Sequence, residues 1–286
     1  MVYDNKKGMP AVLVSIILMT IVFLILLSLA GEIMTLVVSG TDDLRCTWSA
    51  VLHSHTSTFF MGDGFELDCK IDTIFISLQR DNDENPTDIT FRQDGNDQSI
   101  GVPQRYLNAV ESWNQNSYGE GFSFNNPSHR IRYFYDTKIS REMIDCKQKL
   151  GDGNIELFGN DPSGNTCVIC TRFVIPNEND LNYLKHITQG ELVGEFLRSN
   201  PYSFTDIDHQ KSLWEKIRFE GQSDLFDTIG YDMDENLLIV YSVSSGGPLE
   251  SIPVIGHLFS EDDNVGHNIF LTTPDDLSNY CDTVAN

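Results

Sequence analysis

The hydrophobic positions begin with one unbroken apolar stretch, Gly8–Gly31, which contains no charged residue. Within it, Ala11–Ala30 is 20 residues long. At a helical rise of about 1.5 Å per residue, this length spans about 30 Å, the thickness of a bilayer's hydrocarbon core. The pattern therefore predicts a transmembrane helix over residues 9–31, with the lipid bilayer as its partner.

The charges beside this stretch give it an orientation. Lys6 and Lys7 precede it, and the next basic residue is Arg45. Because loops rich in Lys and Arg stay on the cytoplasmic side, we expect residues 1–8 in the cytoplasm. The sequence thus predicts a single-pass protein of the cell membrane, with its C-terminal domain extracytoplasmic.

Two processing sites compete with a permanent anchor. Ser28-Leu29-Ala30 resembles a small-x-small secretory cleavage site, although the apolar run is longer than a usual signal-peptide core. Lys6-Lys7-Gly8-Met9 resembles the site at which archaeal prepilins are cut after the glycine. We favour an uncleaved anchor over both.

Beyond the anchor, helical periodicity continues through a predicted juxtamembrane or stalk helix over residues 32–60. Leu44, Trp48, Val51 and Leu52 share one side of it. An extracytoplasmic domain over residues 61–286 follows, with a subdivision near residues 176–190.

The rest of the chain interleaves strand and helix patterns without a regular βαβ rhythm. The class predicted is therefore α+β, a mixed, mainly antiparallel domain with disulfides. Surface loops are expected at residues 80–101 and 114–129. The expected strands cover residues 65–78, 130–135, 154–158, 166–175, 237–243 and 268–272, and the expected helices cover 103–113, 137–150, 180–186, 191–198, 209–218 and the segment from Thr273 to Cys281.

Composition adds an unusual charge to an otherwise ordinary folded chain. The sequence is 40% hydrophobic, and 42 acidic residues against 19 basic ones give a net charge of −23. Such a surface repels nucleic acid, so no nucleic-acid partner is expected. The acidic residues are scattered, which favours adaptation to salt over one cation-binding surface.

The six cysteines all lie beyond the predicted anchor, and an even number in an exported chain predicts disulfides. If residues 166–175 are extended, Cys167 and Cys170 point to opposite faces and need different partners. We expect Cys146 to bridge to one of these two. Redox and zinc chemistry are disfavoured, since the pair lies on a strand and no second ligand pair exists. The disulfide candidates are Cys46, Cys69, Cys146, Cys167, Cys170 and Cys281.

Motifs that carry chemistry are weak. Two acidic stretches begin like calcium loops but lack the glycine at position six and the acid at position twelve. Two histidine pairs are conceivable metal ligands, and a Gly-Gly-Pro turn follows a predicted buried strand. These stretches are Asp81–Asn85, Asp232–Asn236, His53 with His55, His257 with His267, and Ser244–Pro248. We therefore expect no catalytic, cofactor-binding or metal-binding residue and no cofactor.

One combination of features resembles a known group. A Lys-Lys-Gly leader opens a single anchor, an Arg45-Cys46 helix follows it, and then comes a strand with Cys69. The helix Arg141–Gly153 and the stretch Thr166-Cys-Val-Ile-Cys170 complete the pattern. It resembles uncharacterised N-terminally anchored, single-pass membrane proteins of small-genome archaea. That group has no assigned activity, so the resemblance implies an anchored topology and no site residue.

The function expected from the sequence is a membrane-anchored cell-surface protein with a structural, adhesive or interaction role. Its partners would be other surface proteins or further copies of itself. Two alternatives stay open: a pilin-like filament subunit cleaved after Gly8, and an exported enzyme with an unrecognised site.

Overall fold

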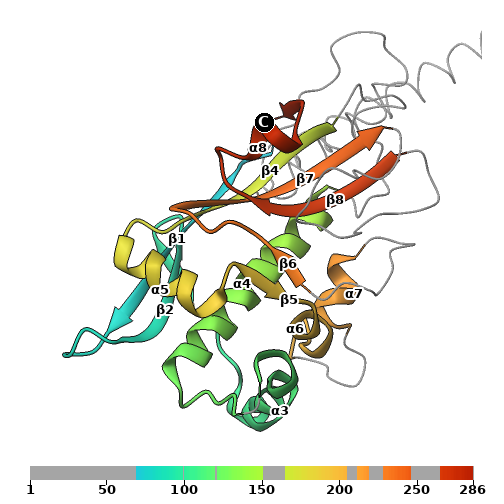
Figure 1. The fold of residues 1–286 in the computed structure, drawn as a ribbon. Coiled ribbons are helices and arrows are strands. Elements are labelled where there is room, and N and C mark those ends of the chain that lie inside the picture. The colour runs from blue at the N-terminus through green and yellow to red at the C-terminus, as the bar shows by residue number, and fades with distance from the viewer. Residues whose placement is uncertain are drawn as a thin grey trace, which may run out of the picture.

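The computed structural model describes residues 69–98, 100–119, 121–150, 165–204, 211–218, 228–245 and 265–285. They form an α+β fold with a mainly antiparallel sheet, as the sequence predicts (Figure 1). The strands are β1 (Asp72–Arg80), β2 (Pro86–Gln93), β3 (Asn96–Gln98), β4 (Asn165–Val174), β5 (Glu191–Val193), β6 (Thr228–Gly230), β7 (Asn236–Ser245), β8 (Val265–Thr272) and β9 (Thr283–Ala285). The helices are the 3₁₀ turn η1 (Gln104–Tyr106), α3 (Leu107–Tyr118), α4 (Pro127–Lys149), α5 (Glu178–Thr188), α6 (Gly194–Ser199), α7 (Leu213–Ile217) and α8 (Leu277–Tyr280).

The main sheet is centred on β4. Its strand order is β3-β2-β1-β4-β7-β8, and β9 also pairs with β4. One edge of β4 is shared by two parallel partners, since β9 pairs with Thr166–Val168 and β1 with Thr171–Val174. The other edge pairs antiparallel with β7. This arrangement places the C-terminal end of the chain beside a strand from its middle.

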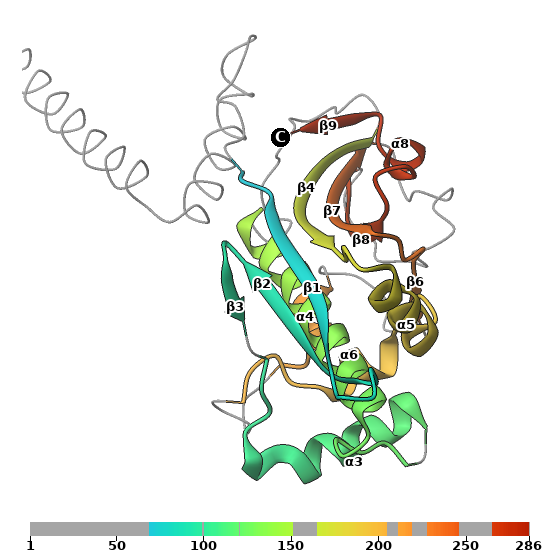
Figure 2. The ribbon, with the colours of Figure 1, turned by 90° about the vertical axis from the view of Figure 1, so that its left-hand side faces the viewer.

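Two disulfides connect β4 to other elements. Cys146 on α4 bonds Cys170, and Cys167 bonds Cys281, which follows α8. Figure 2 shows α4 and α8 on opposite sides of β4. The predictions that Cys167 and Cys170 have different partners, and that one of them bonds Cys146, are therefore confirmed. Cys69 is also disulfide-bonded.

Helix α4 is a long helix that packs on one face of the main sheet, where it contacts β2, β4, β7 and β8 (Figure 2). Asn126 caps its N-terminus by accepting a hydrogen bond from the Ser128 N–H, and Pro127 occupies the first turn. Lys147 and Lys149 complement the dipole in its last turn.

The predicted strand at residues 130–135 is wrong, because these residues form the first half of α4. Their aromatic side chains suggested a strand, but Tyr133 and Tyr135 are buried in the core on a capped helix. Tertiary packing overrides the strand propensity here.

Of the two predicted long loops, the one at residues 80–101 is largely wrong, and the one at 114–129 is too long at both ends. Residues 80–101 contain β2 and β3, joined by a turn at Asp94 and Gly95, whose φ angles of 51° and 79° suit a two-residue hairpin. In the second predicted loop, α3 continues to Tyr118 and α4 begins at Pro127. The polar composition of these residues led the sequence analysis to miss the β2–β3 hairpin, the end of α3 and the start of α4.

Other sequence predictions agree with the described elements in place and type. They include the strands at residues 166–175, 237–243 and 268–272, and the helices at 103–113, 137–150, 180–186 and in the region after Thr273. Residues 191–198 begin with β5 before α6 starts at Gly194. The predicted anchor, the stalk helix and the strand at 154–158 lie outside the described residues. Among the described residues, none of the helices has the length and apolar character to cross a membrane.

A reciprocal pair of side-chain amides joins α3 to the end of α6. The Asn114 Nδ2 donates to Asn200 Oδ1, and the Asn200 Nδ2 donates to Asn114 Oδ1, both at 3.0 Å. Each Nδ2 also donates to the carbonyl four residues earlier in its own helix, Val110 or Phe196. Because both side chains are almost fully buried, each amide depends on the other for its hydrogen bonds.

We predict strong coupling between these two amides. Asn114→Ala and Asn200→Ala each lower the free energy of unfolding by about 1–3 kcal/mol, since each leaves the other buried amide without its partner. The double variant lowers the free energy of unfolding by clearly less than the sum of the two single changes. Urea unfolding followed by tryptophan fluorescence measures this cycle. Asn108→Ala, at an exposed position of α3, is the matched control, and additive single effects would contradict the interpretation.

Candidate functional site

The C-terminal end of α3 and the middle of α4 enclose a buried acid among aromatic and basic side chains. We call this group, made of Tyr118, Arg132, Tyr135, Asp136 and Tyr231, the Asp136 cluster. The Tyr118 hydroxyl donates to Asp136 Oδ2 at 2.6 Å. Arg132 lies one helical turn before Asp136, with its Nε 3.7 Å from Oδ2, and its guanidinium lies over the Tyr118 ring. One carboxylate oxygen is thus held by a phenol and a guanidinium.

The rest of the cluster is a group of three buried oxygens. Asp136 Oδ1 and the hydroxyl groups of Tyr135 and Tyr231 make no hydrogen bond of standard geometry, although the two hydroxyl groups lie close enough to influence each other's pKa. Buried groups of this kind are nearly always bonded to protein or to ordered water. The three oxygens are therefore suited to hold internal water.

The position of Tyr231 depends on the turn after α5. The Tyr231 N–H donates to the Gly190 carbonyl at 2.8 Å. Gly190 has a φ of +67°, and a Cβ there would lie 2.6 Å from the Tyr231 carbonyl oxygen. Glycine is required for this close approach of two backbone segments.

Burial controls the ionisation of the cluster. Desolvation raises the pKa of Asp136 to about 6, although Arg132 and the Tyr118 hydroxyl oppose the shift. Desolvation and the nearby Asp136 charge raise the pKa of Tyr118 well above 10. Burial also raises the pKa of Tyr231, with Tyr135 and Asp136 adding to the effect. Because Asp136 is fully buried, a substrate cannot reach this acid in the described conformation.

A second buried polar group joins α4 to the sheet. Lys138 Nζ lies 2.7 Å from Glu142 Oε1 one turn along the helix, and it also donates to Gln98 Oε1 of β3. Thr171 of β4 donates to the other Glu142 oxygen. The pair is almost fully buried, and these hydrogen bonds to two strands fix where α4 lies on the sheet.

An accessible cavity of about 640 Å³ lies between the β2–β3 hairpin and the ends of α3 and α4. Arg130 of α4 forms part of its wall and donates to the carbonyl oxygens of Phe124 and Thr87. The cavity is lined by Gln79, Asp88, Ile89, Thr90, Asp97, Gln98, Ile100, Gly101, Val102, Leu107, Phe124, Asn125, Arg130 and Phe134.

The stretches that begin like calcium loops lie elsewhere and have local roles. The Asp81 carboxylate accepts hydrogen bonds from the Asp83 and Asn85 N–H groups, which closes the turn between β1 and β2. The stretch Asp232–Asn236 leads into β7 and contains the buried Met233. Within the described residues, no group of three or more His, Cys, Asp or Glu side chains could hold a metal ion.

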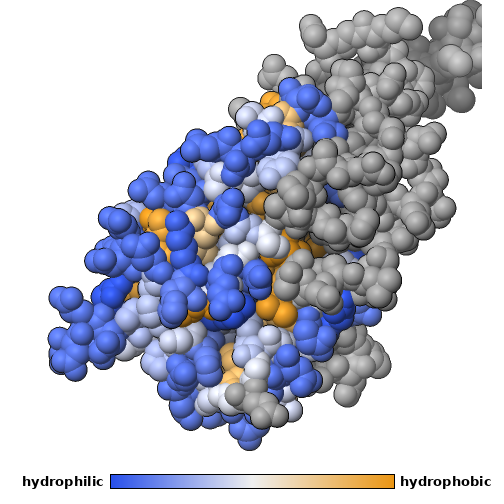
Figure 3. All heavy atoms as spheres, in the orientation of Figure 1, coloured by the Kyte–Doolittle hydropathy of each residue, from blue (hydrophilic) through white to orange (hydrophobic). Residues whose placement is uncertain are grey.

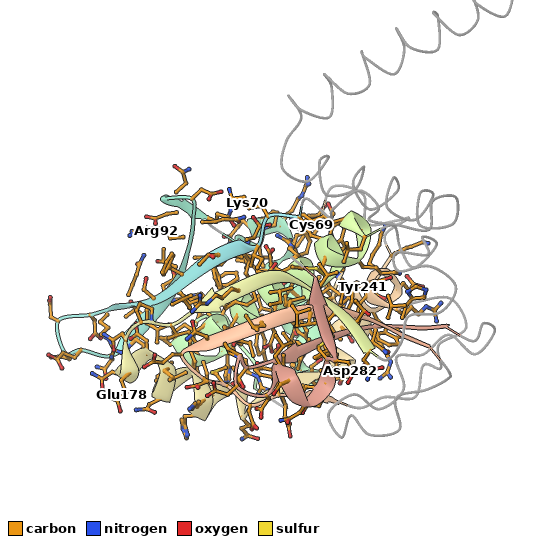
Figure 4. All side chains as sticks on the ribbon, turned by 90° about the horizontal axis from the view of Figure 1, so that it is seen from above. Cys69, Lys70, Arg92, Glu178, Tyr241 and Asp282 are labelled. Atoms are coloured by element: carbon orange, nitrogen blue, oxygen red, sulfur yellow. A yellow bond between two sulfur atoms is a disulfide. The ribbon has the colours of Figure 1, made fainter. Side chains whose placement is uncertain are left out.

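The remaining candidates from the sequence are not gathered at one place. His267 of β8 contacts Tyr241 of β7, whose hydroxyl lies 2.8 Å from its Nδ1. His53, His55, His257 and most of Ser244–Pro248 lie outside the described residues, as does Cys46. Figure 4 shows Cys69 beside Lys70 at the start of β1, far from Asp282, which follows Cys281. The Asp282 carboxylate accepts from the Asn165 N–H at the start of β4.

Sequence reasoning missed both the Asp136 cluster and the cavity. The assignment of residues 130–135 to a strand concealed the (i, i+4) spacing of Arg132 with Asp136. The same spacing relates Lys138 and Glu142, and on a helix it brings opposite charges together. Comparison with known proteins adds no relative: no family model, curated protein or solved structure matches this chain.

We predict that Asp136 destabilises the fold as it ionises. An unfolded carboxyl has a pKa of about 3.9, whereas burial raises that of folded Asp136 to about 6. The folded state therefore binds more protons between these values, and stability falls as the pH rises through 6. Between pH 4 and pH 7, wild type should lose about 2 kcal/mol of unfolding free energy relative to Asp136→Asn.

Urea unfolding at a series of pH values measures this difference. Asp83→Asn, at an exposed position, is the control and should run parallel to wild type. Parallel profiles for wild type and Asp136→Asn would show that the buried carboxyl does not titrate in this range.

Proposed function

We propose that this chain is a membrane-anchored cell-surface protein whose α+β domain lies outside the cell and has a structural, adhesive or interaction role. The observation that carries the proposal is the disulfide bonding of β4 to α4 and to the C-terminal segment. Disulfides persist in oxidising compartments and are rare in the cytosol. Together with the apolar stretch Gly8–Gly31 and the lysines before it, they support an anchor with its C-terminal domain outside.

The surface and the buried polar groups favour binding or structure over catalysis. The face in Figure 3 is mainly hydrophilic, with hydrophobic residues in small separate patches. The acid with the raised pKa, Asp136, is fully buried. Lys138 and Glu142 are occupied by each other and by the sheet. These groups fix the position of α4 against the sheet and α3, as is expected of a structural or binding module.

Thiol labelling together with protease accessibility tests the proposal. In denatured, unreduced protein isolated from intact cells, we expect none of the six cysteines to react with a maleimide, and all six to react after reduction. Protease added to intact cells should digest the domain, and a cytoplasmic marker protein should remain intact as the control. Six reactive thiols without reduction, or a domain protected until the membrane is broken, would contradict the proposal.

The pilin-like alternative rests on Lys6-Lys7-Gly8-Met9, which resembles a prepilin cleavage site. N-terminal sequencing of the protein from membranes separates the two. We expect an intact leader. A mature N-terminus at Met9 would instead favour a filament subunit that assembles through its apolar helix.

A further inference from the structure

The cavity beside the β2–β3 hairpin lies where β3 stops covering β2. Strand β3 pairs only with Phe91–Gln93, so among the described strands none pairs with the first half of β2 on that side. Arg130 instead donates to the Thr87 carbonyl, and the Asp88 side chain accepts from the Ile89 N–H at 2.9 Å. Side chains that occupy the edge in this way oppose the addition of another strand. A small molecule therefore suits this place better than an extended peptide.

The charges around the cavity select against charged ligands. The Arg130 guanidinium in its wall disfavours a cation, and its Nε lies 4.0 Å from Asp88 Oδ1, which compensates the charge of that acid. The net charge of −23 of the chain disfavours an anion. The Asp97 carboxylate is also occupied by Arg92, whose Nε lies 2.8 Å away. A neutral ligand faces neither penalty.

The remaining lining combines planar polar groups with aromatic surface. The Gln79 Nε2 donates to Thr90 Oγ1 at 3.0 Å, and the Gln79 side-chain carbonyl oxygen, the Thr90 hydroxyl proton and the Asn125 amide supply the further acceptors and donors that a polyhydroxylated ligand requires. Phe124 and Phe134 supply apolar ring surface in the same cavity. The volume of about 640 Å³ lies within the range of small-molecule sites.

We propose that this cavity binds a neutral sugar of monosaccharide to disaccharide size. The amide and hydroxyl side chains hydrogen-bond to the hydroxyl groups of the sugar, while its C–H face packs on the phenylalanine rings. This inference rests on the proposed surface location and makes its adhesive role specific, since sugars are ligands that an extracytoplasmic domain can meet.

Gly101 allows a sharp test, because it lines the cavity and a Cβ built on it would meet nothing within 4 Å. Gly101→Leu therefore adds a bulky side chain at the cavity lining without a clash at its Cβ. Gly230→Leu is the matched control, since its Cβ also meets open space and β6 does not line the cavity. Thr90→Val keeps a β-branched side chain in β2 and removes one hydroxyl.

Full-length detergent-solubilised protein is titrated with neutral hexoses, N-acetylhexosamines and their disaccharides, and binding is followed by saturation-transfer NMR and calorimetry. At least one neutral sugar should bind, while glucuronate and glucosamine should not. Gly101→Leu should abolish binding, Gly230→Leu should retain it, and Thr90→Val should weaken it about tenfold.

Failure to bind any sugar of the panel, equal binding by Gly101→Leu, or preference for a charged sugar would overturn the inference. The thiol and protease experiments report on location independently. A domain that is disulfide-bonded and outside the cell but binds no sugar overturns only this inference. A cytoplasmic domain with free thiols overturns the proposed function.

Discussion

Strand β4 is the constraint on which the rest of the described structure depends. It pairs with β7 on one edge and with both β1 and β9 on the other. Cys170 bonds it to α4 on one side, and Cys167 bonds it to the segment after α8 on the other. The first disulfide joins residues 24 apart and the second joins residues 114 apart. On the chain-entropy model, these correspond to about 3 and about 5 kcal/mol of constraint on the unfolded chain.

Helix α4 brings a costly set of polar side chains into the interface with this sheet. Burying an ion pair costs desolvation that its own attraction barely offsets, so Lys138 and Glu142 add little net stability. Their hydrogen bonds to Gln98 and Thr171, however, are satisfied only when α4 lies in one register over β3 and β4. In the same way, the hydrogen bond from Tyr118 to Asp136 is satisfied only when α4 lies in one position against α3. The polar contacts thus choose a position for the helix, while the surrounding aromatic and aliphatic burial provides the driving force.

The arrangement of α4 also links the two features with potential chemistry. Arg130, in the first turn, closes the open edge of β2 and forms a wall of the cavity. Arg132 and Asp136, on the following turns, form the buried cluster with Tyr118. One helix therefore separates an accessible cavity, suited to a ligand, from a sealed polar group, suited to internal water. This separation is the reason to assign binding to the cavity and a structural role to Asp136.

Local patterns in the sequence were sufficient for β4, β7, β8 and the second half of α4, because β-branched runs and capped helical periodicity state their structure within a few residues. Cys167 and Cys170 are three residues apart on a strand, so they point to opposite faces, and this spacing also determined that they have different partners. Local patterns failed for the first half of α4, where aromatic residues favour a strand and only packing against α3, α6 and the sheet makes a helix. They failed again for β2 and β3, whose polar residues form strands because β1 offers a partner edge to β2, and β2 offers one to β3. Which cysteine Cys146 bonds, how Asp136 is buried and where the cavity lies all depend on contacts between residues far apart in the chain, and only the tertiary structure decides them.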